Sequence, residues 1–301
     1  MRIGGITLWL LGSALALYLA ALGAFYIFQR VFYYPAPGGG LTLAEDPGPG
    51  FQDMSLTTSD GLVLRAFYHP PRQGRPTLVF FHGNGGDLNG SEVATRAFAA
   101  QGYGVLLPEY RGYGGNPGTP NEQDLYRDGA AGIYWLENSR LPLKDIVLIG
   151  NSLGSGVATE LAKRKKVGGL ILVSGFASLP RVVAQHYPYI PGFLVRDKFD
   201  NRAKIGRVTA PILIYHGTAD TVVPVSNGRA LARAQPAATF ALERGAGHDL
   251  MFSPVATRRI SAWLRDRFPV PPPPPPPSPL PPPDSGTPLD HRDGSVSNSS
   301  P

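Results

Sequence analysis

Residues 51 to 268 alternate short apolar runs with amphipathic stretches, and this alternation restricts the possible folds more than any other feature of the sequence. Most of the apolar runs are uninterrupted, as is typical of parallel strands that are covered on both faces. Helices are predicted between them, at 91–101 and 121–138 among others. The pattern predicts an α/β fold with a mostly parallel sheet and helices on both faces. The predicted strands are 77–83, 102–110, 145–151, 169–175, 211–217 and 238–244.

Two local signals refine this prediction. The segment LTTSDGLVLRAFYH is expected to form an antiparallel hairpin that leads into the sheet, with Asp60 and Gly61 as left-handed turn residues. Ahead of the helix at 121–138, Thr119 is predicted as the N-cap, Pro120 as the first helical residue and Glu122 as its capping-box partner.

The composition of the N-terminal residues is typical of a segment that spans a membrane. Residues 6–28 contain neither a charge nor a proline, and a helix of this length crosses about 30 Å of hydrocarbon. Aromatic residues gather around Arg30, as at a lipid headgroup interface. A cleaved signal peptide is the alternative, but its apolar region is usually shorter and ends at small residues. We predict a single-pass anchor at 1–34 and a linker at 35–50. The flanking charges, Arg2 and Arg30, leave open which side of the membrane the folded domain occupies.

The other terminus, residues 269–301, is rich in proline and is predicted to be an extended, disordered tail. A spacer is the simplest interpretation, and a ligand for a partner that binds polyproline II helices is the alternative. The chain has no cysteine, which excludes disulfide scaffolds, thiolate metal sites and cysteine nucleophiles. The net charge of +6 forms no basic stripe interleaved with aromatics, so nucleic acid is not an expected partner.

The sequence Gly150-Asn151-Ser152-Leu153-Gly154 follows a predicted strand directly and precedes a predicted helix. In this G-x-S-x-G context the serine occupies a sharp strand-to-helix turn, and glycines flank it because side chains there would collide with neighbouring elements. The motif alone is common, but the strand–turn–helix context removes most chance matches. It predicts Ser152 as a catalytic nucleophile.

A serine nucleophile needs a base and a group that orients the base. Asp220 follows the predicted strand 211–217, and His248 follows the predicted strand 238–244. Singly, Asp220 is equally compatible with a turn and His248 with a helix cap. Their order after Ser152 is that of α/β-hydrolases, and each follows the carboxyl end of a strand, where α/β sheets build their active sites. The three residues are predicted to form a catalytic triad.

Two further groups of residues are expected at the site. The glycine-rich loop 82–86 is predicted to supply the backbone amide of Asn84 to an oxyanion hole, together with the amide of Leu153. Residues 176–210 are too long for a simple connection and are predicted to form a small cap. Its aromatic residues either line an acyl-binding surface or pack the cap onto the body of the domain. The candidates for substrate contact are Phe176, Tyr187, Tyr189 and Phe193, whereas His186 is interpreted as structural.

Five segments in order resemble the Bem46-like α/β-hydrolases, including the abhydrolase-domain-13 and abhydrolase-domain-17 types: HGNGGDLNG, EYRGYGGNPGTPNEQDLYRDGAAGIYWL, LIGNSLGSGVATELA, HGTADTVVP and GAGHDL. The resemblance covers about residues 51–268, and the N-terminal anchor is similar to that of the domain-13 type. It implies a hydrolase of esters or thioesters with Ser152, Asp220 and His248 in the triad. The family usually has aspartate at the position of Glu109 and glycine at the position of Ser155.

The sequence thus predicts a membrane-anchored serine hydrolase that needs no metal or organic cofactor and acts on a small-molecule or lipid-like acyl substrate. A protein depalmitoylase and a prolyl-type peptidase are alternatives within the enzymes, although no extra recognition domain precedes the hydrolase segment. A non-catalytic, membrane-tethered interaction protein of the same fold is the alternative outside them, because a fold alone does not establish activity.

Overall fold

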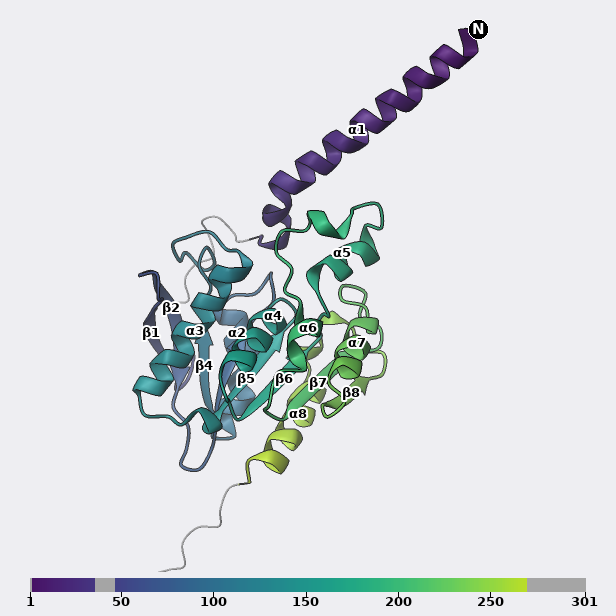
Figure 1. Ribbon diagram of the computed structural model, residues 1–301. Coiled ribbons are helices and arrows are strands. Elements are labelled where there is room, and N and C mark those ends of the chain that lie inside the picture. Colours follow the sequence, from purple (N-terminus) through teal and green to yellow (C-terminus); the bar gives the residue numbers. More distant parts are fainter. Residues whose placement is uncertain (1, 36–46, 270–301) are drawn as a thin grey trace, which may run out of the picture. The chain divides into compact units, whose positions relative to one another are not determined.

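An eight-stranded sheet organises the chain, in the order β1-β2-β4-β3-β5-β6-β7-β8 (Figure 1). This computed structural model describes residues 2–35 and 47–269. All pairs from β4 to β8 are parallel, while β1 and β2 form the predicted antiparallel entry. The mostly parallel α/β sheet is confirmed. The strands are β1 (Gln52–Thr57), β2 (Val63–His69), β3 (Thr77–Phe81), β4 (Gly104–Pro108), β5 (Ile146–Asn151), β6 (Gly169–Val173), β7 (Ile212–Gly217) and β8 (Thr239–Glu243).

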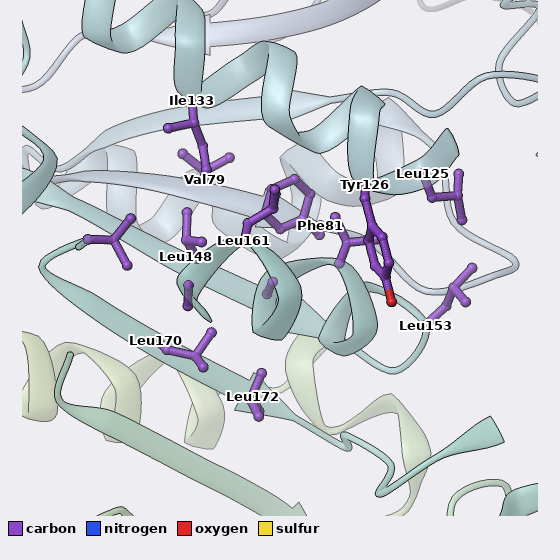
Figure 2. Packing of buried hydrophobic residues seen from close by; sticks show 14 of the residues in the cluster. Val79, Phe81, Leu125, Tyr126, Ile133, Leu148, Leu153, Leu161, Leu170 and Leu172 are labelled. Carbon is purple, nitrogen blue, oxygen red and sulfur yellow. The ribbon is translucent and has the colours of Figure 1, made fainter. Parts of the chain in front are cut away.

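Helices cover both faces of the sheet, because successive residues of each central strand point to opposite sides. On β5, Leu148 belongs to one buried cluster and Ile149 to the other. Figure 2 shows part of the first cluster, in which strand residues such as Leu148 meet Ile133 and Leu161 of the covering helices. The first cluster includes residues of α3 (Glu122–Asn138), α4 (Gly154–Arg164), α6 (Asn201–Ile205) and α7 (Ser226–Ala234), and the second those of α2 (Leu88–Ala100) and α8 (Pro254–Arg267).

The start of α3 differs from the predicted capping box. Asn121 is the N-cap, and its side-chain oxygen accepts from the amides of Gln123 and Asp124. Thr119 and Pro120 therefore lie before the helix, and Glu122 is its first residue. The carboxylate of Glu122 accepts from the amide of Lys198 and from the hydroxyl of Tyr126 instead of from a capping amide. The prediction was wrong because two cap-forming residues stand two positions apart and a tertiary contact selects the later one.

The hairpin turn follows the prediction at only one of its two residues. Gly61 has φ +87°, but Asp60 is not among the residues with positive φ. The carboxylate of Asp60 instead accepts from Thr58 and from Arg111, whose guanidinium is buried. This ion pair joins the hairpin to the loop that follows β4.

The N-terminal helix α1 (Arg2–Tyr33) is long and apolar enough to span a membrane from Gly5 to Tyr33. Buried and partly buried polar contacts join its last turns to the segment 194–197. Gln29 donates to the carbonyl of Leu194 and accepts from the amide of Arg196. Arg30 forms a two-bonded ion pair with Asp197, which also accepts from the hydroxyl of Tyr34. We call these contacts the Asp197 clasp. Of the predicted linker at 35–50, residues 36–46 lie outside the described chain, as does all but Pro269 of the predicted tail.

The predicted cap, residues 176–210, contains two structurally different halves. The first half holds α5 (Leu179–His186) and a short 3₁₀ turn η2 (Gly192–Leu194), and lies beside the end of α1 (Figure 1). The second half holds α6, which packs against α4 and α7 on the body of the domain. Phe199 is fully buried there between Tyr126 and Phe176. Only the first half extends beyond the body as a cap.

Candidate active site

Ser152 occupies the tight turn between β5 and α4. Its φ of +49° is unusual for a residue with a side chain and marks a strained conformation. The flanking glycines have the close contacts that the motif predicts. A Cβ atom on Gly150 would lie 2.5 Å from the carbonyl oxygen of Gly154, and one on Gly154 would lie 2.0 Å from that of Phe81. The turn therefore requires glycine at both positions, and it holds Ser152 just beyond the carboxyl end of the central strand β5.

We expect Gly154→Ala to destabilise the protein by about 3 kcal/mol, because a methyl group cannot fit against backbone that is itself fixed in β3. Thermal unfolding of the purified variant measures this loss. Gly85→Ala is the matched control, since a Cβ atom at Gly85 would meet open space. Equal melting temperatures for the two variants would contradict the close packing of the turn.

The structure brings Ser152, His248 and Asp220 together in one hydrogen-bonded series. Nε2 of His248 lies 2.9 Å from Oγ of Ser152, and Nδ1 lies 2.9 Å from Oδ2 of Asp220. His248 begins the 3₁₀ turn η3 (His248–Phe252), and Ser174 fixes its backbone by donating to its carbonyl oxygen. The three predicted residues thus have the geometry in which an imidazole can take a proton from a serine hydroxyl.

Asp220 is held rigidly. It is buried, and its Oδ1 accepts from the amides of Val222 and Val223. Burial opposes its charge, but hydrogen bonds from His216, His248 and the Val223 amide outweigh burial and lower the pKa of Asp220 below its usual range. The carboxylate therefore stays ionised and able to stabilise a protonated His248. Sequence reasoning missed His216, whose Nε2 lies 3.4 Å from Oδ2, although it stands in the same HGTAD segment.

The glycine-rich loop lies directly beside the nucleophile. A Cβ atom on Gly83 would be 3.4 Å from that of Ser152, and Asn84 lines the same cavity as Ser152. The side chain of Asn84 points to the anchor helix and donates to the carbonyl of Tyr33. Leu153 caps the N-terminus of α4, where backbone amides point outward without helical partners. The predicted oxyanion residues, Asn84 and Leu153, are thus both next to Ser152.

A buried ion pair of His82 with Glu109 contacts the backbone of this loop. Nε2 of His82 lies 2.7 Å from Oε1 of Glu109, and Nδ1 lies 2.6 Å from the carbonyl oxygen of Gly83. Because both ring nitrogens face acceptors, His82 fits this environment as an imidazolium that donates twice. Burial opposes its charge, but Glu109 and the Gly83 carbonyl prevail and raise the pKa of His82. Oε2 of Glu109 also accepts from the amide of Leu88, which ties α2 to the same pair.

The other departure from the family pattern, Ser155, is fully buried on α4. Its hydroxyl lies 3.4 Å from the side-chain nitrogen of Asn201, which donates also to the carbonyl of Phe176. Ser155 therefore connects the helix after the nucleophile with α6.

A cavity of about 240 Å³ opens at Ser152. It is lined by Phe80, His82, Gly83, Asn84, Gly85, Gly86, Gly90, Ser91, Asn151, Ser152, His248, Asp249 and Phe252. None of the four residues predicted to contact substrate is in this lining. Phe176 is buried against Phe199, Tyr187 and Tyr189 face the anchor helix, and Phe193 is 81% exposed. That these residues contact substrate therefore stays a prediction, because the sequence alone does not reveal which way the cap extends. Phe80 and Phe252 were missed because apolar residues in a strand and a turn carry no special signal.

Within residues 2–35 and 47–269, no group of three histidine, aspartate or glutamate side chains is placed to hold a metal ion. The polar groups at and beside the cavity include those that an acyl-transfer reaction uses: a nucleophile, a base with its carboxylate, and backbone amides.

Comparisons with known proteins agree with the fold. Residues 76–202 match the family model described as alpha/beta hydrolase fold. An uncharacterised protein of Mycobacterium tuberculosis is 35% identical over 226 residues, which cover 73% of this chain and 80% of that protein. Protein bem46 of Schizosaccharomyces pombe is 28% identical over 228 residues, which cover 70% and 76% respectively.

One further relative and one solved structure are also similar to this chain. Lysophosphatidylserine lipase ABHD12 of Danio rerio is 30% identical over 181 residues, which cover 53% of this chain and 47% of that protein. Among solved structures, the esterase Pf2001 of Pyrococcus furiosus superposes with a TM-score of 0.61 at 19% identity, covering 78% of this chain and 97% of the esterase. That similarity shows the fold alone. From the family model and these relatives, the chain belongs to the Bem46-like α/β-hydrolases.

Proposed function

We propose that this hydrolase is a membrane-anchored serine enzyme that cleaves carboxylic ester or thioester bonds through an acyl-enzyme. The observation that carries the proposal is the hydrogen-bonded series of Ser152, His248 and Asp220 at the mouth of a cavity. The relative named as a lipase supports ester chemistry. The apolar length of α1 supports the anchor.

In the proposed reaction, Oγ of Ser152 attacks the carbonyl carbon while Nε2 of His248 accepts the serine proton. Asp220 keeps Nδ1 protonated and stabilises the imidazolium. The backbone amides of Asn84 and Leu153 donate to the oxyanion of the tetrahedral intermediate. His248 then protonates the leaving alkoxide or thiolate as its bond to the carbonyl carbon breaks. A water molecule, deprotonated by His248, releases the acid and regenerates Ser152.

Labelling with a fluorescent fluorophosphonate tests the proposal, because only an activated serine reacts with this probe. The full-length protein in detergent micelles is expected to label, and Ser152→Ala is expected not to. Ser139→Ala, which changes a serine at the far end of α3, is expected to label like the wild type. If the wild type does not label while p-nitrophenyl esters also remain intact, the proposal fails and a non-catalytic, membrane-tethered protein becomes the better description.

A further inference from the structure

A second cavity, of about 250 Å³, lies between the end of the anchor helix and the cap. Phe25, Phe32 and Tyr33 of α1 line one side, and Val183, Tyr187, Tyr189 and Ile190 of the cap line the other. Every lining side chain is apolar or aromatic. A space of this kind binds a hydrocarbon chain better than it binds a polar ligand.

The position of the cap along α1 indicates where such a chain comes from. The hydroxyl of Tyr18 donates to the carbonyl oxygen of Tyr189, at 2.7 Å. Tyr18 lies in the middle of the apolar stretch 6–28, about 22 Å along the helix from Tyr33 at 1.5 Å per residue. When α1 crosses a bilayer, the loop that carries Tyr189 therefore lies at the level of the hydrocarbon.

The surface of the cap agrees with this placement. Tyr187, Tyr189 and Phe193 are 51%, 60% and 81% exposed, an arrangement that is unfavourable in water and favourable in lipid. Charged groups lie at the base of the same loop. The guanidinium of Arg196 stacks over the ring of Tyr26, and the ammonium of Lys198 donates to the carbonyl of Gly192. Aromatic residues next to arginine and lysine are typical of a membrane interface.

One hydrogen bond connects a residue that lines the second cavity with a residue that lines the catalytic one. Tyr33 lines the cavity at the anchor, Asn84 lines the cavity at Ser152, and the Asn84 side chain donates to the Tyr33 carbonyl. The hydroxyl of Tyr33 is buried and has no hydrogen-bond partner among the residues that the structure describes. A polar group of a bound ligand would satisfy it.

We propose that this second cavity binds the acyl chain of a membrane lipid ester whose carbonyl group reaches Ser152, so that the anchor helix forms one wall of the substrate site. The inference rests on the proposed function and names its substrate class. The chain enters from the bilayer at Phe25 and Phe32 and passes Tyr33 and Asn84. The ester then lies in the catalytic cavity, where hydrolysis proceeds as described above.

Filling the cavity tests the inference. Ile190→Trp places a large ring in it, and Val63→Trp adds the same ring at an exposed position on β2. Full-length proteins in phospholipid nanodiscs are assayed with p-nitrophenyl acetate and p-nitrophenyl decanoate. The ratio of kcat/KM for decanoate to that for acetate is expected to fall at least tenfold in Ile190→Trp and to stay at the wild-type value in Val63→Trp. An unchanged ratio in Ile190→Trp would overturn the inference while leaving the serine hydrolase intact. The proposed function fails separately, if the wild-type protein is not labelled by the fluorophosphonate.

A second measurement needs no turnover. Ser152→Ala protein in nanodiscs is irradiated in the presence of a phospholipid with a photoreactive acyl chain. Cross-links are expected on Val183, which lines the cavity and is buried, besides those on lipid-exposed residues of α1 and of the cap, and Ile190→Trp is expected to remove the Val183 cross-link. Cross-links on the exposed residues without Val183 would show that lipid surrounds the helix and the cap without entering the cavity, and would overturn the inference.

Discussion

Replacing His248 with alanine is expected to lower kcat for ester hydrolysis by about 10⁶-fold, as much as Ser152→Ala lowers it. The base and the nucleophile act as one unit, because the 2.9 Å hydrogen bond between them is the route of the proton. The double variant is therefore expected to be no slower than either single one. Asp220→Asn is expected to lower kcat less, by about 10⁴-fold. This variant keeps the base, His248, and disturbs only the orientation of the imidazole and the stabilisation of its charge.

Steady-state rates of the full-length proteins, corrected for folded fraction, measure these effects. His186→Ala is the matched control, since His186 is an exposed cap histidine that contacts the carbonyl of Val222 and not the cavity at Ser152. Additive losses in the double variant, or a His248→Ala enzyme within tenfold of the wild type, would show that Ser152 and His248 do not act as a unit.

Glu109→Gln is expected to reduce the free energy of unfolding by about 3–5 kcal/mol, because it breaks a buried ion pair. Both carboxylate oxygens of Glu109 accept hydrogen bonds, Oε1 from His82 and the Tyr110 amide and Oε2 from the Leu88 amide. Glutamine has one acceptor oxygen, so its NH₂ group faces a donor. Chemical denaturation measures the loss. The control is Asp53→Asn, which breaks the exposed pair with Arg65 and is expected to cost about 0–1 kcal/mol.

The ion pair of His82 with Glu109 also makes the free energy of unfolding depend on pH in a definite direction. The pKa of His82 is raised in the folded protein. The ion pair therefore contributes fully to the free energy of unfolding below the pKa of an unfolded histidine, about 6.5. This contribution is lost as the pH rises through the pKa that His82 has in the folded protein. The stability difference between wild type and Glu109→Gln is therefore expected to shrink toward alkaline pH. A difference that grows with pH would contradict a charged His82.

The order of elements was predictable because it depends on local periodicity. Buried parallel strands are apolar runs, and all six predicted runs contain a strand of the sheet. The proximity of Ser152, Asp220 and His248 was predictable because each follows the carboxyl end of a strand, and parallel strands bring those ends to one edge. Those inferences needed no knowledge of distant contacts.

The predictions that failed concern contacts between segments far apart in the chain. Whether Thr119 or Asn121 caps α3 depends on Glu122 reaching Lys198, which the local sequence does not reveal. The direction in which the cap aromatics point depends on α1, so the sequence could not show that none of them lines the cavity at Ser152. Ion pairs such as Arg30 with Asp197 connect residues 167 positions apart, so no local pattern indicates them.

The Asp197 clasp has a consequence for how the enzyme encounters its substrate. A domain on a loose tether samples many orientations and heights above a membrane, but here three side chains of the helix end, Gln29, Arg30 and Tyr34, are bonded to the cap itself. If α1 spans a bilayer as proposed, rotation of the domain about its anchor is restricted, and Ser152 stays at one depth relative to the lipid surface. Protease cleavage within residues 36–46 would then leave the hydrolase attached to the membrane through noncovalent contacts. The effective substrate concentration is in that case a number of molecules per area of bilayer rather than per volume of solution.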